Sequence, residues 1–444
     1  MRGPLLAALL VAGLASWVHG QDSLSAPQAD EVDRTTLWPH IQAASDLRDI
    51  RSGTVTWDSS GSGTLVFSAR DGGQYAWATI PPAANGWDLA RRSTVEAPVT
   101  NLGPTPVEVQ VWTVASRGWE SVADVATLAP GETRLFACPL RETFPDGTPK
   151  LDPGRVAGIR ILLRKATAGT VIRITGLAAT GSAPAWTPPQ GRIEVPPAEE
   201  GQPAAGRRVR HRLTPHKGTD ITCLLHLPDD WKPGGRYPVI LEYPGNVFYV
   251  KGCYSTGLPD QCGIGFGMAR GRGAIWVSMP FIDRATGTIA ENGWGDADET
   301  ASFCEHVVDD VCARFGGDRR NLILTGFSRG AIACGFIGLR NDRIAPLWKG
   351  FHLCQHFDGD GWNGATLESA VERARRFRGS AVFHTDNPEN AVRPVTDAMN
   401  VPTTFVQSGL GAHSIAMFLD DRDSTRQLRR WFEQLVAMVP DVRP

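Results

Sequence analysis

The sequence has no marked excess of charge of either sign. It contains 45 Lys and Arg residues against 47 Asp and Glu residues, which gives a net charge of −2. So small a charge provides no electrostatic reason to expect binding to nucleic acid or to an anionic membrane. The hydrophobic share of 42% and the charged share of 21% are typical of a soluble globular protein. Because 444 residues are too many for one ordinary core, we expect two domains.

Signatures of metal binding are also missing from the sequence. None of the eight cysteines has the close paired spacing of a zinc site, and no His-Glu-x-x-His motif occurs. The sequence therefore predicts neither a metal nor another cofactor.

The even number of cysteines allows disulfides in an oxidising compartment. Cys253 and Cys262 flank a turn-rich stretch and form the best local pair. Cys304 and Cys312 lie too far apart along one predicted helix to bond each other. Each of these two needs a partner elsewhere in the chain or remains a buried thiol, and the sequence leaves the pairing open.

The N-terminal apolar stretch is too short to be a membrane span. It runs from Leu5 to Val18, follows a positive charge at Arg2, and ends before small or branched residues suited to cleavage after Gly20. Residues 1–20 therefore predict a secretory signal peptide, with an uncleaved anchor as the alternative. We expect a secreted or periplasmic protein with no membrane attachment after cleavage, and a polar lead-in at residues 21–35.

Residues 36–183 carry the signals of an all-β domain. Three runs alternate or are rich in β-branched residues, namely Thr64–Ser68, Val107–Trp112 and Thr170–Ile174. Turn clusters such as Asp71-Gly72-Gly73 separate them. Many short strands joined by regular turns predict a β-sandwich.

The order of these strands resembles the galactose-binding-like, jelly-roll carbohydrate-binding modules. The resemblance rests on the stretches "VTNLGPTPVEVQVWT", "ATLAPGETRLFACPL" and "RVAGIRILLRKATAGTVIRITGLAA". It implies a sandwich that holds a glycan through aromatic side chains. The candidate platforms are Trp57, Trp77, Trp87, Trp112 and Trp119. The alternative for each tryptophan is packing in the core or at its rim.

Residues 184–206 are rich in proline and glycine, which predicts a linker without regular structure. The basic run that follows, Arg207–Arg212, alternates with apolar or neutral positions. We interpret it as an edge strand with solvated charges rather than an anion-binding patch.

Strands and helices alternate over residues 207–440. The predicted strands are 221–227, 237–243, 273–279, the apolar run from Leu322, 350–354, 380–384 and 403–407. The predicted helices are about 298–315, the stretch after Ser328, and about 424–438. Apolar strands alternating with helices predict a mostly parallel sheet covered on both faces.

Ser328 lies between one of these strands and the following helix. The strand Leu322–Thr325 leads into Gly326-Phe327-Ser328-Arg329-Gly330, a Gly-x-Ser-x-Gly motif at a sharp bend. Such a bend puts the serine in a strained backbone conformation, and the two glycines remove side chains that would collide there. Ser328 is therefore the candidate nucleophile.

Residues 207–439 resemble the α/β-hydrolase superfamily, most closely its secreted esterases, polyester depolymerases and prolyl-oligopeptidase-type domains. The stretches that carry the resemblance are "RYPVILEYPGN", "NLILTGFSRGAIACG", "SAVFHTDNPEN" and "GLGAHS". The family orders its triad as serine, acid and histidine on loops at the carboxyl ends of strands. The resemblance thus implies Ser328 as nucleophile, Asp386 as acid and His413 as base.

The acid is the member of this triad whose surroundings depart from the family pattern. The stretch His384-Thr385-Asp386 lacks the glycine of the usual family form and is compressed. Glu389 is therefore the near alternative, and Asp358 and Asp360 are the distant ones. The carboxylate must orient the imidazole and stabilise its charge.

The oxyanion hole requires two backbone N–H groups aimed at the developing charge. We expect one from Arg329 and the other from Asn246 or Gly245, which follow a predicted strand. The side chain of Arg329 is expected to contact an acidic substrate or to pair with a neighbouring acid.

Aromatic loop residues are the candidates for substrate binding. Trp294, Tyr249 and His356 are predicted to line the pocket, with Phe248 and Trp362 nearby. Loop anchoring is the alternative role for the aromatic residues.

These features predict a secreted serine esterase that forms an acyl-enzyme, with an ester-bearing glycan or polymer, most simply an acylated polysaccharide, as substrate. The alternatives are a polyhydroxyalkanoate-type depolymerase or a serine peptidase that keeps the same fold. A non-catalytic glycan-binding protein is the alternative from another class. No repeat of blade length precedes the hydrolase region, unlike the usual oligopeptidases.

Overall fold

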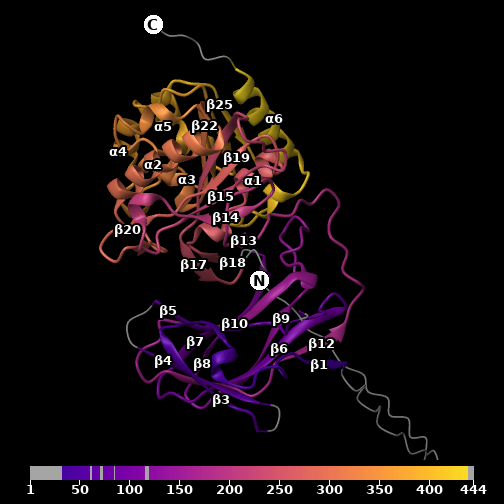
Figure 1. The fold of residues 1–444 in the computed structure, drawn as a ribbon. Coiled ribbons are helices and arrows are strands. Elements are labelled where there is room, and N and C mark those ends of the chain that lie inside the picture. Colours follow the sequence, from indigo (N-terminus) through magenta and orange to yellow (C-terminus); the bar gives the residue numbers. More distant parts are fainter. Residues whose placement is uncertain (1–32, 61–62, 71–73, 85, 116–119, 439–444) are drawn as a thin grey trace, which may run out of the picture. The chain divides into compact units, whose positions relative to one another are not determined.

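The computed structural model describes residues 33–60, 63–70, 74–84, 86–115 and 120–438 (Figure 1). The predicted signal peptide and nearly all of the predicted lead-in lie outside the described residues. The described chain from Arg34 onward groups into one compact unit, so the predicted domain limits stay predictions. Within the described part of the chain, no helix is both long and apolar enough to cross a membrane.

Residues 34–182 form two antiparallel sheets. The first has the order β1 (Arg34–Thr36), β12 (Ala178–Ser182), β6 (Arg92–Asn101), β11 (Val171–Ile174), β4 (Thr64–Ala69) and β3 (Gly53–Asp58), with β9 (Thr133–Pro139) also paired to β6. The second has the order β2 (Arg48–Arg51), β5 (Tyr75–Ile80), β10 (Val156–Arg164), β7 (Val107–Ala115) and β8 (Ser121–Leu128).

The two sheets share one hydrophobic core. Residues of this core alternate along the strands, as with Leu65 and Phe67 in β4 and Ile159 and Ile161 in β10. This period of two turns one apolar face of each sheet into the core, where the two faces meet. The predicted sandwich is therefore present, whereas the jelly-roll family remains a resemblance.

The tryptophans of the sandwich are not free platforms for a sugar. Trp57 meets Trp38 edge-on, with ring centroids 5.0 Å apart, and the indole of Trp87 donates to the Leu37 carbonyl. Trp77 is buried against Tyr249, and Trp112 is buried against Tyr254. All four thus pack against neighbouring residues, with Trp57 and Trp87 half-buried, and Trp119 lies outside the described residues.

Residues 198–406 contain a nine-stranded sheet. Its order is β13 (Ala198–Glu199), β14 (Arg208–His211), β15 (Cys223–His226), β19 (Ile275–Ser278), β16 (Tyr237–Tyr243), β22 (Gly317–Phe327), β23 (Gly350–Cys354), β24 (Ala381–Thr385) and β25 (Thr403–Val406). All pairings are parallel except the two that β15 makes. The prediction of a mostly parallel sheet is confirmed.

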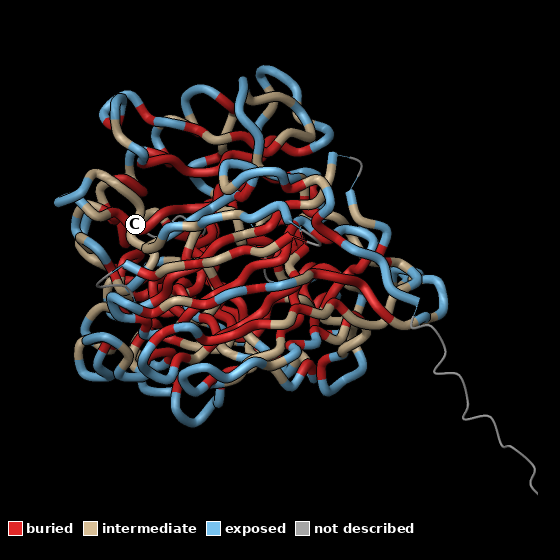
Figure 2. The backbone as a smooth tube through the Cα atoms, turned by 90° about the horizontal axis from the view of Figure 1, so that it is seen from below, coloured by how far each residue is buried: buried red, intermediate tan, exposed pale blue. Residues whose placement is uncertain are grey.

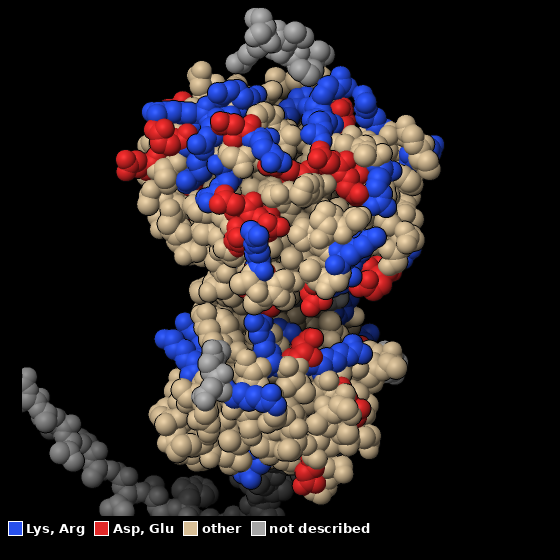
Figure 3. Space-filling model, turned by 60° about the vertical axis from the view of Figure 1, so that its left-hand side comes forward, with Lys and Arg blue, Asp and Glu red and all other residues tan. Residues whose placement is uncertain are grey.

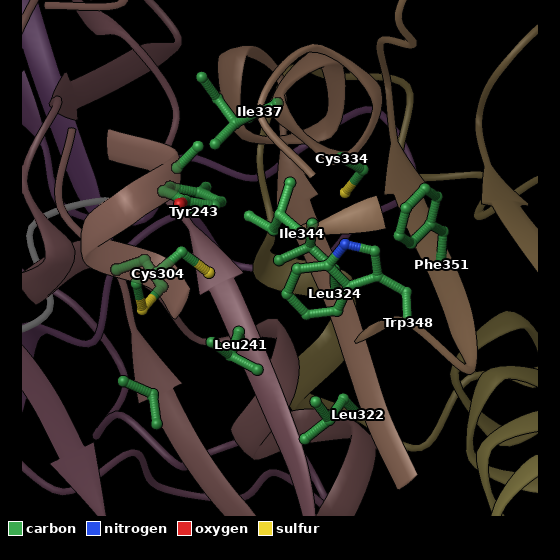
Figure 4. Close-up of a cluster of buried hydrophobic side chains, with 14 of the residues drawn as sticks. Leu241, Tyr243, Cys304, Leu322, Leu324, Cys334, Ile337, Ile344, Trp348 and Phe351 are labelled. Atoms are coloured by element: carbon green, nitrogen blue, oxygen red, sulfur yellow. The ribbon is translucent and has the colours of Figure 1, made fainter. Parts of the chain in front are cut away.

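Helices cover both faces of this sheet. One face carries α2 (Ala297–Phe315), α3 (Arg329–Phe336), α4 (Leu367–Ala374) and α5 (Glu389–Met399), and the other carries α1 (Ile264–Ala269) and α6 (Asp423–Ala437). In β22, Leu322 and Leu324 pack in the core under α2 to α5, here called the first core, while Ile323 packs in the core under α1 and α6. Figure 2, which looks from below, shows buried backbone in the interior and exposed backbone in the outer loops, and Figure 4 shows the first core around Leu324 and Trp348.

Short elements connect the larger ones. Two hairpins are formed by β17 (Val247–Val250) with β18 (Cys253–Thr256) and by β20 (Ile282–Asp283) with β21 (Thr288–Ile289). Single 3₁₀ turns occur at Ala44–Asp46, Pro153–Arg155, Thr214–His216, Pro259–Gln261, Ala345–Leu347, Trp362–Gly364 and Ala416–Leu419. The sequence patterns did not predict either hairpin.

The predicted disulfide between Cys253 and Cys262 is wrong. All eight cysteines are free thiols. Cys262 is buried with its sulfur 3.6 Å from the Glu242 carbonyl, so it faces the end of β16 rather than Cys253. Cys304 and Cys334 lie as separate thiols in the first core, as Figure 4 shows.

The basic run that begins the second region differs from its prediction. β14 is not an edge strand, because β13 pairs with its outer side within the predicted linker. Arg208 is buried, and its guanidinium lies over the Trp276 ring and donates to the Pro259 carbonyl at 2.9 Å. Elsewhere, Figure 3 shows side chains of both charges interspersed on the face in view.

Candidate active site

Ser328 occupies the bend between β22 and α3. Its backbone has φ 55° and ψ −121°, a conformation that costs a non-glycine residue about 1–3 kcal/mol. The Ser328 N–H donates to the Cys354 carbonyl at 3.0 Å, which ties the bend to the end of β23. The strained turn expected from the motif is present.

The two glycines of the motif are required by close backbone approach. A Cβ at Gly326 would lie 2.2 Å from the carbonyl carbon of Gly330. A Cβ at Gly330 would lie 2.0 Å from the Tyr243 carbonyl oxygen. No side chain fits at either position without moving the backbone, which explains the residue types.

Ser328 opens into a cavity of about 170 Å³. The wall combines apolar and hydrogen-bonding side chains from five separate segments of the chain. Its residues are Asn246, Phe248, Cys253, Ser255, Phe327, Ser328, Arg329, Ile332, His356, Trp362 and His413. The cavity therefore brings the predicted nucleophile and the predicted base together with His356.

His413 lies on the loop after β25. Its ring is 4.4 Å from that of Phe327 and 5.5 Å from that of His356, measured between centroids. Burial, and secondarily the neighbouring His356, lowers the pKa of His413 to about 4. The imidazole is thus neutral at neutral pH, as a general base must be.

The described residues show no hydrogen bond from His413 to Ser328 or to Asp386. Catalytic hydrogen bonds are often long without substrate and tighten when it binds. The structure thus places Ser328 and His413 at one cavity without a direct hydrogen bond between them.

Asp386 follows β24 and has φ 59°. Its carboxylate accepts hydrogen bonds from the Ser408 N–H at 2.6 Å, the Ser408 hydroxyl at 2.5 Å and the Gln355 side-chain amide at 3.2 Å. The same Gln355 amide donates to the Ala412 carbonyl at 2.7 Å, one residue before His413. Gln355 thus links the acid to the histidine loop.

The alternative acids have other partners. Glu389 forms an ion pair with Arg393 on α5, and Asp358 is buried in an ion pair with Arg373. Asp360 accepts from His356 Nδ1 at 2.5 Å, so this histidine–carboxylate pair stands beside the cavity.

Sequence reasoning missed Gln355 and Ser408. Gln355 has φ 62° and its role depends on two loops that meet only in the fold. Ser408, directly after the last strand, had a positional signal, because that loop end was already expected to carry the base.

Two of the three residues predicted to form the oxyanion hole line the cavity. Asn246 and Arg329 line the cavity with Ser328, whereas Gly245 does not. The Asn246 side chain bonds Asn292 at 2.8 Å and the Gly293 N–H at 2.9 Å. The expectation that the Arg329 side chain contacts an acid is wrong, because its guanidinium is buried among backbone carbonyls.

Two of the predicted substrate residues lie away from the cavity. Trp294 stacks on Phe336 with centroids 4.4 Å apart and meets Trp362 edge-on, so it supports Trp362 from behind. Tyr249 is only 1% exposed and packs edge-on against Tyr75. Both therefore anchor loops, and His356 alone of the three lines the cavity.

The β17–β18 hairpin has two differently used faces. Phe248, Cys253 and Ser255 line the cavity, while the alternate residues Tyr249 and Tyr254 point the other way. Tyr254 meets the Trp112 ring edge-on at 5.1 Å, and the Tyr249 carbonyl accepts from Gln110. The five-stranded sheet thus supports one wall of the cavity.

No group of three or more His, Cys, Asp and Glu side chains is placed to hold a metal in the described part of the chain.

Comparison with known proteins gives little about function. No family model matches the sequence, and no curated protein matches it. Among solved structures, one from a study of two esterases of Rhizomucor miehei is 13% identical and aligns over 49% of this chain and 79% of its own, with a TM-score of 0.33. An AtxE2 isopeptidase structure is 14% identical over 91% of this chain and 64% of its own, with a TM-score of 0.39.

A structure of the family 29 carbohydrate-binding module CBM29-2 is 16% identical over 34% of this chain and 92% of its own, with a TM-score of 0.22. Scores this low carry no argument about activity, substrate or family. The case for a function rests on the geometry of the site.

Proposed function

We propose that this chain is a serine hydrolase of the α/β-hydrolase type that cleaves carboxylic esters. The observation that carries the proposal is the strained bend at Ser328, which opens into a cavity shared with a neutral, half-buried His413. A strained serine between strand and helix, with an imidazole beside it, is the arrangement that nucleophilic acyl transfer needs.

The proposed reaction has two steps. Ser328 Oγ attacks the ester carbonyl carbon as its proton passes to His413, and the C–O bond to the alcohol then breaks as His413 returns that proton to the leaving oxygen. Water adds to the acyl-enzyme by the same transfers and releases the acid and Ser328. Asp386 would orient the imidazole and stabilise its transient charge.

The cavity suits a short acyl group. Its volume of about 170 Å³ is on the scale of the ~150 Å³ engineered cavity that binds benzene. Phe248, Ile332 and Trp362 give it an apolar wall. We therefore expect acetyl to butyryl esters to react faster than long-chain ones.

An acylated polysaccharide as natural substrate, and export of the protein, remain proposals from the sequence. The four described candidate tryptophans of the sandwich pack against neighbouring residues, so they add no support for glycan binding. The polyester and peptide alternatives keep the same nucleophile and differ only in the substrate hydrolysed.

The test is hydrolysis of p-nitrophenyl esters from two to eight acyl carbons by wild type, Ser328→Ala and a control, Ser59→Ala, an exposed serine in the sandwich. We expect wild type and control to hydrolyse the short esters and Ser328→Ala to lose the activity. Equal rates for all three proteins, or no hydrolysis by any, contradict the proposal. Acetylated xylan, a polyhydroxybutyrate film and a peptide nitroanilide then separate the substrate classes.

A further inference from the structure

Arg329, the residue after the candidate nucleophile, is a buried cation without a carboxylate partner among the described residues. It is 1% exposed, and its guanidinium lies 4.0 Å from the centre of the Phe281 ring. Burial lowers the pKa of the side chain to about 9, which still leaves it charged at neutral pH. Burying an unpaired charge is costly, so its hydrogen bonds must provide compensation.

The guanidinium donates to four backbone carbonyls that come from three loops. These bonds are 2.9 Å to Gly245, 2.9 Å to Gly257, 3.1 Å to Ala290 and 2.9 Å to Gly293. A planar group with five fixed N–H donors can serve several acceptors at once, whereas the point charge of a lysine cannot. Arg329 therefore fixes these loops with respect to the start of α3.

The bond to Gly245 has a consequence for the next amide. In a trans peptide the carbonyl and the following N–H point in opposite directions. With the Gly245 carbonyl held on the guanidinium, the Asn246 N–H is turned away from it. No described residue accepts a hydrogen bond from this N–H, and Asn246 lines the cavity beside Ser328.

The far side of Asn246 is fixed by the same network. Its side-chain oxygen accepts from the Gly293 N–H at 2.9 Å, and the Gly293 carbonyl accepts from Arg329. The peptide before Asn246 and the loop at Gly293, which its side chain contacts, are thus both attached to one guanidinium.

We propose that Arg329 assembles both donors of the oxyanion hole. Its own N–H, at the first position of α3 where helix geometry leaves it without an acceptor, is one donor. Its side chain is a positioning group that directs the second donor, the Asn246 N–H, into the cavity. This inference rests on the proposed serine hydrolase function and names the part of the site that would stabilise the transition state.

The test separates the side chain of Arg329 from its backbone. Arg329→Lys keeps the backbone donor and the charge but removes the fork. Asn246→Pro deletes the Asn246 N–H, and Asn246→Ala is its matched control because it loses only the side chain. The readouts are kcat/KM for a p-nitrophenyl ester, inhibition by a trifluoromethyl ketone that forms a tetrahedral adduct, and Tm.

We expect Arg329→Lys in the Asn246→Ala background to lower kcat/KM by about 10²-fold, with a matching loss of ketone affinity. In the Asn246→Pro background the same change should cost much less, because the donor that it positions is already absent. An equal cost in both backgrounds, with activity following Tm, overturns the inference and assigns Arg329 to fold stability alone.

Should Arg329→Lys fail to fold, the two Asn246 variants decide the matter. Asn246→Pro should be about 10²-fold less active than Asn246→Ala, and equal activities overturn the inference. A wild-type protein that neither hydrolyses esters nor binds the ketone overturns the proposed function and this inference together. An active wild type with an additive cycle overturns this inference alone.

Discussion

At the residue scale, the proposed chemistry depends on a histidine that burial keeps neutral. The pKa of His413 is lowered to about 4 from an ordinary value of 6.5, so the base remains free of its proton well into the acidic range. Burial disfavours the charged imidazole, and only the neutral imidazole can act as a base.

The pH dependence of kcat/KM should therefore be shifted to acid. A protonated His413 cannot accept the Ser328 proton, so activity should hold down to about pH 5 and fall as pH drops through about 4. His356→Gln should move this limb upward, because the neighbouring imidazole helps to lower the pKa of His413. A limb near pH 6.5 in the wild type contradicts the assignment.

The identity of the acid can be decided by matched amide substitutions. Asp386→Asn keeps the shape of the side chain and removes its charge, and we expect kcat to fall by about 10³-fold or more. Glu389→Gln should leave kcat unchanged, since Glu389 pairs with Arg393 on α5. If Asp360→Asn produces the large loss and Asp386→Asn does not, the acid is instead the partner of His356.

At the element scale, the β17–β18 hairpin joins the cavity to the five-stranded sheet. Its side-chain alternation sends Phe248 and Ser255 to the cavity and Tyr254 to Trp112. A strand pair used on both faces transmits a change on one face to the other, because its residues cannot move independently.

A substitution in the sandwich should therefore change the activity. Trp112→Phe shrinks the ring that meets Tyr254 edge-on and removes the indole bond to Gln110. We expect a several-fold loss of kcat/KM and a changed preference for acyl length, measured well below Tm. Leu135→Ala, at an exposed position of the same region, should have no effect. Unchanged kinetics in Trp112→Phe would show that the sheet does not support the cavity wall.

Most of the elements could be predicted from local patterns. The strand at Tyr237–Tyr243 and the helix beginning near Ala297 have the expected positions because apolar runs and acidic or glycine caps mark them. The β17–β18 hairpin was not predicted, although its turn contains Gly252, because aromatic residues there suggested a pocket loop.

The partners of single residues could be predicted least well. The burial of Arg329 depends on carbonyls from three loops, and the link through Gln355 depends on two. No local pattern in the sequence contains such contacts, because they arise only when distant segments meet.

At the scale of the whole molecule, three buried histidines and one half-buried histidine make the folded state sensitive to acid. His226, His352, His384 and His413 have pKa values lowered to between about 3 and about 4, chiefly by burial. Below pH 6.5 these histidines bind protons in the unfolded chain but stay neutral in the folded chain. The free energy of unfolding therefore decreases as the pH is lowered, by about 1.4 kcal/mol per pH unit for each such group.

His226 offers the cleanest test of this effect. Neither of its ring nitrogens has a hydrogen-bond partner among the described residues, and it lies against Phe266 and Trp276. Replacing it by Phe should raise stability. The variant should lose about 1.4 kcal/mol less per pH unit than the wild type between pH 6.5 and 4. Parallel urea-unfolding curves for the two proteins over that range would contradict the explanation.

The central claim, that Ser328 is a nucleophile activated by His413, has one direct test. The full chain is treated with a fluorophosphonate, digested, and analysed by mass spectrometry for the modified peptide. We predict a single adduct on Ser328 in the wild type, formed at least 100-fold more slowly in His413→Gln. An unlabelled Ser328, or equal labelling in the two proteins, would contradict the account.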